Sequence, residues 1–227
     1  MALNRVSRVD DRVKIRNVLL SVSDKTGLGP LVEGLLAVNP DLRLYSTGGT
    51  YAHLESLLGE RAAVSLKAVS DYTGQPEMQG GLVKTLDFKI YMGLLSETYN
   101  EAHRLDLKRT ACIEFDLVVV NLYPFQQTVA ATGVTLEDAR ANIDIGGPCM
   151  LRASAKNFLR VASVCDPADY PSLVDELKKN QGTLGLASRL HFAKKTFAHT
   201  AAYDSAISAF LLSVPGLPDD LYQFGGR

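Results

Sequence analysis

The sequence predicts a layered α/β fold with a mostly parallel sheet and a helical C-terminal region. Short apolar runs alternate with segments of helical spacing through the first two thirds of the chain. Beyond Gly185, an alanine-rich segment continues without proline or glycine as far as Ser213. Alternation of this kind is typical of parallel sheets, because each crossover between neighbouring parallel strands usually carries a helix.

Apolar runs at residues 17–22, 42–46, 115–122 and 161–165 are predicted to be the strands. The third run, FDLVVVNL, is apolar enough for us to expect burial on both faces of the sheet.

Helical spacing predicts helices at 28–38, 50–58, 135–143 and 167–180. Thr135 and Asp138 form a capping-box pattern, and Pro167 suits a first helical turn capped by Asp166. Residues 183–213 are expected to form one or two helices. We therefore expect an N-terminal extension at 1–15, one domain at 16–213 that includes the C-terminal helices, and a tail at 214–227.

Composition excludes several classes of function. The 24 basic and 25 acidic residues nearly cancel, so we expect no nucleic-acid partner, and any anion site must be local. No stretch approaches the roughly 20 apolar residues of a membrane span. The cysteines have no metal-ligand spacing and fit buried, reduced thiols, so we expect a cytoplasmic protein.

Two turns at the ends of predicted strands carry the equipment of a phosphate site. SVSDKTGL at 21–28 supplies hydroxyls, an ammonium and backbone N–H groups, and YSTGGT at 45–50 adds two glycines before a helix. Each turn alone could be an ordinary helix cap. Both follow successive strands of one sheet, so we expect them to converge on one crevice.

Two further segments could contribute to the same edge of the sheet. NLYPF places Asn121 and Tyr123 after the most buried strand, although a core tyrosine before a proline turn is an equal alternative. NIDIGGPCMLRASAKN places Asp144 before a glycine pair and Lys156 twelve residues later. These two groups can share a site only if the chain folds back. A capping aspartate and an exposed lysine are the alternative.

Taken together, SVSDKTGL, YSTGGT, VSDYTGQPEM, VKTL, DLVVVNLYPF, NIDIGG and LRASAKN resemble the inosine monophosphate cyclohydrolase domain of the bifunctional purine biosynthesis protein. The resemblance spans residues 17 to about 212. It implies a methylglyoxal-synthase-like fold, a homodimer, no cofactor and no metal. It also implies closure of 5-formamidoimidazole-4-carboxamide ribonucleotide (FAICAR) to inosine monophosphate (IMP), the ring-closing direction of a hydrolase that acts on cyclic amidines. The family continues into a formyltransferase domain, so a separate formyltransferase is a further expected partner.

The resemblance also implies residue roles. Lys84 and Tyr123 are expected to stabilise or protonate the formyl oxygen, and Asp144, paired with Lys156, to accept the carboxamide proton. The substrate-binding residues that it implies are Ser21, Ser23, Lys25, Thr26, Gly27, Ser46, Thr47, Gly48, Gly49, Thr50, Thr85, Asn121, Ile145, Gly146 and Gly147.

The segment around Lys84 departs from the family pattern VKTLHPKIHGG and the arginine that precedes it. The departures are Leu82, Asp87, Phe88, Tyr91 and Met92. Losing an arginine and gaining an aspartate lowers the positive potential near an anionic substrate. If these residues line the pocket, we expect altered substrate choice or lost activity. If they lie away from it, we expect a segment whose sequence constraint was relaxed by the loss of the partner domain.

Two other functions stay open. One is a non-catalytic purine-nucleotide-binding or regulatory subunit that works with a separate formyltransferase. The other is methylglyoxal synthase, which shares the implied fold and phosphate cradle, although NIDIGG and LRASAKN favour the cyclohydrolase.

Overall fold

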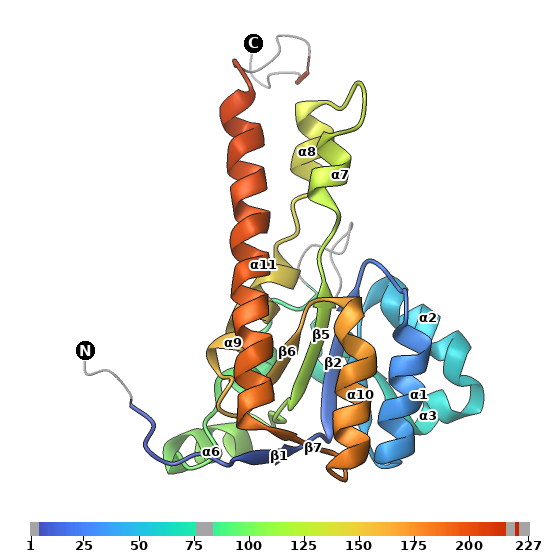
Figure 1. The fold of residues 1–227 in the computed structure, drawn as a ribbon, viewed down its shortest axis with the longest axis vertical. Coiled ribbons are helices and arrows are strands. Elements are labelled where there is room, and N and C mark those ends of the chain that lie inside the picture. Colours follow the sequence, from blue (N-terminus) through green and yellow to red (C-terminus); the bar gives the residue numbers. More distant parts are fainter. Residues whose placement is uncertain (1–4, 76–83, 217–220, 223–227) are drawn as a thin grey trace.

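The structure, a computed structural model, describes residues 5–75, 84–216 and 221–222. Helices cover both faces of a central sheet, and the longest helix runs beside it (Figure 1). The strands are β1 (Arg12–Lys14), β2 (Asn17–Val22), β3 (Arg43–Ser46), β4 (Leu66–Ala68), β5 (Leu117–Asn121), β6 (Ala162–Val164) and β7 (Thr183–Gly185). The helices are α1 (Leu28–Val38), α2 (Gly48–Leu58), α3 (Ala62–Ser65), α4 (Val69–Thr73), α5 (Phe88–Leu95), α6 (Glu101–Arg109), α7 (Phe125–Val129), α8 (Leu136–Ala141), α9 (Gly146–Lys156), α10 (Tyr170–Lys179) and α11 (Leu186–Ser213), with short 3₁₀ turns at Gly59–Arg61 and Pro167–Asp169.

The central sheet has the order β4-β3-β2-β5-β6, and every neighbouring pair is parallel. The predicted α/β fold is thus confirmed, and each predicted strand corresponds to one of β2, β3, β5 and β6. Strand β4 was not predicted. Neither was the antiparallel pair of β1 and β7, which places residues 12–14 of the expected N-terminal extension inside the fold.

Burial on both faces of β5 is confirmed. Val118 and Val120 pack in a cluster with residues of α5 and α9, whereas Leu117 and Val119 pack in a second cluster with residues of α1 and α10. Each of these side chains is at most 1% exposed. Because successive side chains of a strand point to opposite faces, the two clusters lie on opposite sides of the sheet.

The predicted helix starts are confirmed at two positions. Thr135 and Asp138 form the reciprocal capping box at the start of α8. The Asp166 carboxylate accepts a hydrogen bond from the N–H of Ala168 at 2.9 Å. The Thr135 hydroxyl and the Asp166 carboxylate thus accept from N–H groups that the first helical turn leaves without intrahelical acceptors.

The C-terminal region is one helix rather than two, and it begins after the strand β7. Leu184 of β7 is fully buried, and the guanidinium of Arg189, also fully buried, donates to the carbonyl groups of Leu184, Asp10 and Asp11. These bonds attach the N-terminal segment to the start of α11. The distal half of α11 extends past the sheet beside α7 and α8 (Figure 1), where Phe210 packs edge-on against Phe125.

Within the described ranges, no helix combines the length and apolar composition that a membrane crossing requires.

Candidate functional site

A cavity of about 460 Å³ lies at the carboxyl edge of the sheet. Its walls come from the turns after β2, β3 and β5, from residues 84–85, and from the segment that joins α8 to α9. The predicted convergence of the two strand-end turns therefore occurs. Ligands of open α/β sheets bind at this edge where neighbouring strands send their turns to opposite faces and leave a crevice. Strands β2 and β5 are such a pair, because α1 packs on one face of the sheet and α9 on the other.

The turn after β2 is held by Asn121 at the end of β5. The Asn121 side-chain amide donates to the carbonyl of Asp24, and its oxygen accepts from the Asp24 N–H, both at 2.8 Å. The Asp24 carboxylate in turn accepts from the N–H of Thr26 at 2.9 Å. Asn121 thus lines the cavity and also fixes the backbone of the turn that presents Ser23 and Lys25.

The turn after β3 is fixed by buried hydroxyls. The Ser46 hydroxyl donates to the carbonyl of Leu20 at 2.8 Å, and the Thr50 hydroxyl both donates to the carbonyl of Val22 and accepts from its N–H, each at 3.0 Å. These bonds join the end of β3 and the first turn of α2 to β2. The start of α2 lines the cavity, and a helix N-terminus favours anions.

Gly48 and Lys84 meet at this helix start. Gly48 has φ of +50°, and a Cβ atom built on it would lie 3.0 Å from the ammonium nitrogen of Lys84. Glycine therefore provides both the left-handed backbone and the space for the lysine head group. Lys25 and Lys84 both line the cavity, so it carries local positive charge although the chain as a whole has a net charge of −1.

The opposite wall is the segment that leads into α9. The Asp144 carboxylate accepts a hydrogen bond from the N–H of Gly147 at 2.9 Å. A Cβ atom on Gly147 would lie 2.5 Å from Asp144 Oδ2, and one on Gly146 would lie 2.6 Å from the Thr85 hydroxyl. Both separations are too short for any side chain, so the glycine pair lets Asp144 and Thr85 approach the start of the helix.

Burial raises the pKa of the Asp144 carboxyl, and hydrogen bonds from the backbone of Gly147 and Tyr123 partly offset this effect. Removal from water disfavours the charged form of an acid, whereas donors to the carboxylate favour it. A raised pKa lies closer to neutral pH, and a proton acceptor works most effectively when its pKa is near the operating pH.

Most of the predicted site residues line this cavity. They are Ser21, Ser23, Lys25, Thr47, Gly48, Gly49, Thr50, Lys84, Thr85, Asn121, Tyr123, Asp144, Ile145, Gly146 and Gly147. Thr26, Gly27 and Ser46 lie just outside it and shape the turns. The sequence did not single out Val22, Ala141, Asn142, Ile143 and Met150, which also line the cavity. Their only signal in the sequence is adjacency to predicted residues.

Lys156 does not line the cavity, and the structure does not pair it with Asp144. It is exposed and ends α9, whereas the cavity touches the start of that helix at Gly146. A helix rises 1.5 Å per residue, which separates the two ends by about 15 Å. The chain does not fold back between them because the whole stretch is one helix.

Four of the five departures from the family pattern also lie away from the cavity. Asp87 caps α5 by accepting from the N–H of Lys89 at 2.8 Å. Phe88, Tyr91 and Met92 line a separate apolar groove against α6. Leu82 lies outside the described residues. None of these four residues lines the cavity, as expected of a relaxed segment, although the Tyr91 hydroxyl is buried.

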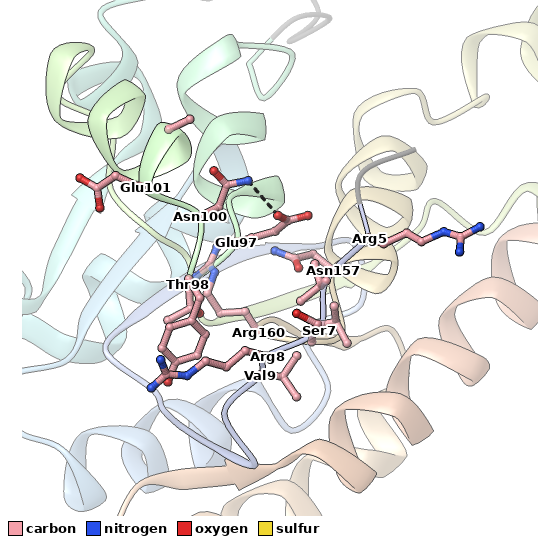
Figure 2. A pocket seen from close by; sticks show the side chains of 14 residues that line it. Arg5, Ser7, Arg8, Val9, Glu97, Thr98, Asn100, Glu101, Asn157 and Arg160 are labelled. Atoms are coloured by element: carbon pink, nitrogen blue, oxygen red, sulfur yellow. Dashed lines mark hydrogen bonds between the residues drawn. The ribbon is translucent and has the colours of Figure 1, made fainter. Parts of the chain in front are cut away.

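A second cavity, of about 510 Å³, lies between residues 5–9 and the start of α6 (Figure 2). Its buried polar side chains are used by the fold, because Asn157 donates to the carbonyl groups of Leu94 and Ser96, and Arg160 donates to those of Ser96 and Phe115. The cavity at the carboxyl edge is therefore the better candidate site.

Comparison with known proteins agrees with the fold. The family model described as MGS-like domain matches residues 27–149, and the one described as AICARFT/IMPCHase bienzyme matches residues 154–223. Among solved structures, the chain is similar to one described as "Crystal structure of ForH", with 31% sequence identity and a TM-score of 0.73. That match covers 89% of this chain and 100% of the other.

Proposed function

The chain belongs to the AICARFT/IMPCHase bienzyme family and carries its MGS-like domain, and from this premise we propose that it is an IMP cyclohydrolase. The observation that carries the proposal is the cavity that brings Lys84, Tyr123 and Asp144 together with two phosphate-type turns. Its substrate is FAICAR, and its products are IMP and water.

The phosphate of the substrate binds at the start of α2, near Lys25. The N-terminal N–H groups of α2 favour the dianion, and the Lys25 ammonium adds a charge-assisted hydrogen bond. This anchor directs the base of the nucleotide toward the opposite wall of the cavity, where Asp144 lies.

Ring closure joins two groups of one molecule, so proximity is largely supplied by the substrate. The carboxamide nitrogen attacks the formyl carbon, and a C–N bond forms. Asp144 accepts the proton that leaves this nitrogen, and Lys84 or Tyr123 donates a proton to the formyl oxygen. The resulting hydroxyl then leaves as water, while the former formamido nitrogen gives up its proton and a C=N bond forms.

The direct test supplies FAICAR and records the appearance of the IMP chromophore. Lys84→Met and Asp144→Asn are expected to lower kcat by roughly 10²- to 10⁴-fold, the range of a lost proton-transfer or charge-stabilising group. Lys89→Met is the matched control. Lys89 belongs to the same segment, does not line the cavity, and donates to the carbonyl groups of Tyr72 and Thr73 instead.

The same assay separates the alternatives. IMP binding without any turnover would identify a non-catalytic nucleotide-binding subunit, and formation of methylglyoxal from dihydroxyacetone phosphate would identify methylglyoxal synthase. Lys156→Met is expected to turn over like wild type, because Lys156 lies at the far end of α9. Lost turnover in that variant would mean that Lys156 of a second copy of the chain completes the site.

The homodimer and the separate formyltransferase partner belong to the same proposal. Sedimentation of the chain alone, and with a formyltransferase that produces FAICAR, measures both associations.

A further inference from the structure

Tyr203 of α11 reaches back across the fold to the wall of the cavity. Its hydroxyl oxygen accepts a hydrogen bond from the backbone N–H of Asp144 at 2.8 Å, and its O–H lies 3.4 Å from the carbonyl of Asn142, to which it donates. Tyr203 does not line the cavity, but both of the residues that it contacts do. The bond joins residues that are 59 positions apart in the chain.

The segment that Tyr203 holds has no regular structure of its own. Residues 142–145 lie between the end of α8 and the start of α9 and belong to neither a helix nor a strand. The N–H groups of Asn142 and Ile143 still bond to carbonyl groups of α8, whereas the N–H of Asp144 bonds to the Tyr203 hydroxyl. A buried backbone N–H needs an acceptor, and the contact from α11 supplies it at the residue that carries the carboxylate.

The tyrosine itself is held rigidly. It is 8% exposed, and its ring packs edge-on against Phe125 with centroids 6.1 Å apart. Phe125 in turn packs against Phe210, one further residue of α11. A buried aromatic ring that packs against a second packed ring can place its hydroxyl with little rotational freedom.

Asp144 is thus held at its backbone and at its carboxylate. Tyr203 binds the backbone N–H, and the backbone N–H groups of Gly147, at 2.9 Å, and of Tyr123 bind the carboxylate. These bonds together set the direction in which the carboxylate points. Proton transfer requires a hydrogen-bonding distance to the reacting nitrogen, and displacement of about 1 Å can cost roughly 10²-fold in rate.

We propose that Tyr203 is a positioning residue, which aims the Asp144 carboxylate at the reacting nitrogen through the backbone of residues 142–144. The inference rests on the proposed function, because it gives Asp144 the role of proton acceptor. Tyr203 touches no substrate, so its removal is expected to act on kcat rather than on KM.

The test compares Tyr203→Phe with Tyr72→Phe. Tyr72 is 9% exposed, its hydroxyl accepts from the N–H of Ile113 at 2.9 Å, and its ring packs edge-on against Phe115. It does not line the cavity. The two variants therefore remove the same atom from the same kind of buried bond, once beside Asp144 and once away from it.

Tyr203→Phe is expected to lower kcat by about 10- to 100-fold while KM changes by less than about threefold. Tyr72→Phe is expected to keep both parameters within about twofold of wild type. An equal loss in the two variants, or a rise in KM with unchanged kcat in Tyr203→Phe, would overturn the proposal, because a merely structural hydroxyl gives those results.

Hydrogen exchange at the Asp144 amide provides a readout that does not depend on turnover. Tyr203→Phe is expected to speed this exchange at least about tenfold, and Tyr72→Phe to leave it unchanged. An unchanged rate in Tyr203→Phe would overturn the proposal whatever the kinetics show. If wild type forms no IMP, the proposed function fails, and the exchange rate alone then decides whether Tyr203 positions Asp144.

Discussion

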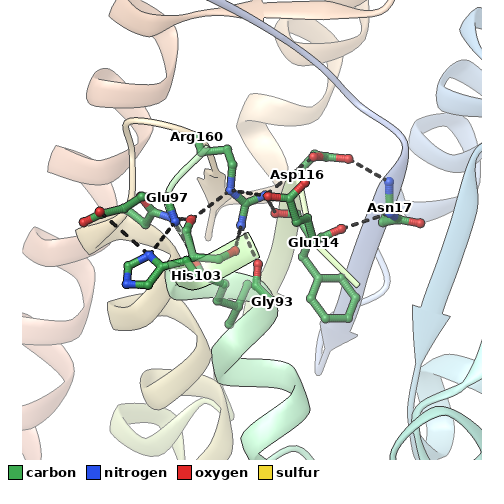
Figure 3. A network of polar contacts seen from close by, with 11 residues as sticks. Asn17, Gly93, Glu97, His103, Glu114, Asp116 and Arg160 are labelled. Carbon is green, nitrogen blue, oxygen red and sulfur yellow. Dashed lines mark hydrogen bonds and ion pairs between the residues drawn. The ribbon is translucent and has the colours of Figure 1, made fainter. Parts of the chain in front are cut away.

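Replacement of Arg160 by methionine tests how the amino edge of the sheet is held together. Arg160 is 4% exposed, and its guanidinium donates to the carbonyl of Ser96 at 3.1 Å, to that of Phe115 at 2.9 Å, to that of Gly93, and to the Ser96 hydroxyl at 3.2 Å (Figure 3). The carboxylate of Asp116 lies 3.7 Å away. Methionine keeps most of the apolar stem and removes every one of these donors.

The cost follows from what each acceptor retains. The Ser96 carbonyl keeps a bond from Asn157 at 2.8 Å, and the Gly93 carbonyl keeps one from the N–H of Phe115 at 3.2 Å. The Phe115 carbonyl loses its charged donor, which costs about 1.5–3 kcal/mol, and the weakened acceptors add about 1 kcal/mol each. Arg160→Met should therefore lower the free energy of unfolding by about 3–5 kcal/mol, the usual range for a broken buried charge contact.

Thermal unfolding measures this loss. For a chain of this size each kcal/mol lowers Tm by about 2–4 °C, so we expect a decrease of roughly 6–20 °C. The matched control is Arg152→Met. Arg152 is exposed, and its guanidinium lies 5.6 Å from the centre of the Phe197 ring, a contact of about 0.5–1 kcal/mol.

A Tm of Arg160→Met no lower than that of Arg152→Met would refute this reasoning. Below its melting range, Arg160→Met should form IMP at the wild-type rate, because Arg160 lies at the amino edge of β5 and the candidate site lies at its carboxyl edge.

Three further outcomes are expected. Gly34→Ala would place a Cβ atom 2.6 Å from Val174 Cγ1 and should lower the urea midpoint by an amount equivalent to about 1–3 kcal/mol. A second substitution, Val174→Ala, removes the clashing atom and should partly restore the midpoint. Additive effects of the two substitutions would contradict this. A hydrogen bond from Arg140 lowers the pKa of Glu137 to about 2. Its small, solvent-screened stabilisation is therefore present above about pH 4.5 and lost as the pH falls toward 2, so Tm should depend less on pH in that window in Glu137→Gln. Because burial raises the pKa of Asp144, kcat should increase with pH through a value above the ordinary aspartate range, and a pH-independent kcat would contradict its role as proton acceptor.

The convergence of the phosphate-type turns could be predicted because it depends on local patterns and one general rule. Each turn follows an apolar run, and parallel strands place their carboxyl ends at one edge. The role of Lys84 came from the resemblance to a family and not from spacing, since residues 80–93 show no single period. The structure brings its ammonium to Gly48, a contact across 36 positions that only the folded chain reveals.

Other features had no local signal. Strands β1 and β7 are three residues each and pair across about 170 positions, so no periodic pattern marks them. No sequence pattern marks Arg160 and Arg189 as buried, yet they are 4% and 0% exposed. Their burial is tolerated because carbonyl groups at strand and helix ends accept their hydrogen bonds, and such acceptors exist only after those ends have been assembled.

The placement of Asp144 shows why the candidate site needs the whole chain. The match to the MGS-like domain ends at residue 149, and nearly all of the cavity comes from residues up to that point. The segment that carries Asp144 is nevertheless held by Tyr203, inside the second match at 154–223. Helix α11 also binds the edge strand β6, where the Thr196 hydroxyl donates to the carbonyl of Ser163 at 3.0 Å. The C-terminal helix therefore covers the β6 edge of the sheet and, through the Tyr203 hydroxyl, holds the wall of the cavity. The residues of the first match alone lack this contact, on which the proposed ring closure depends.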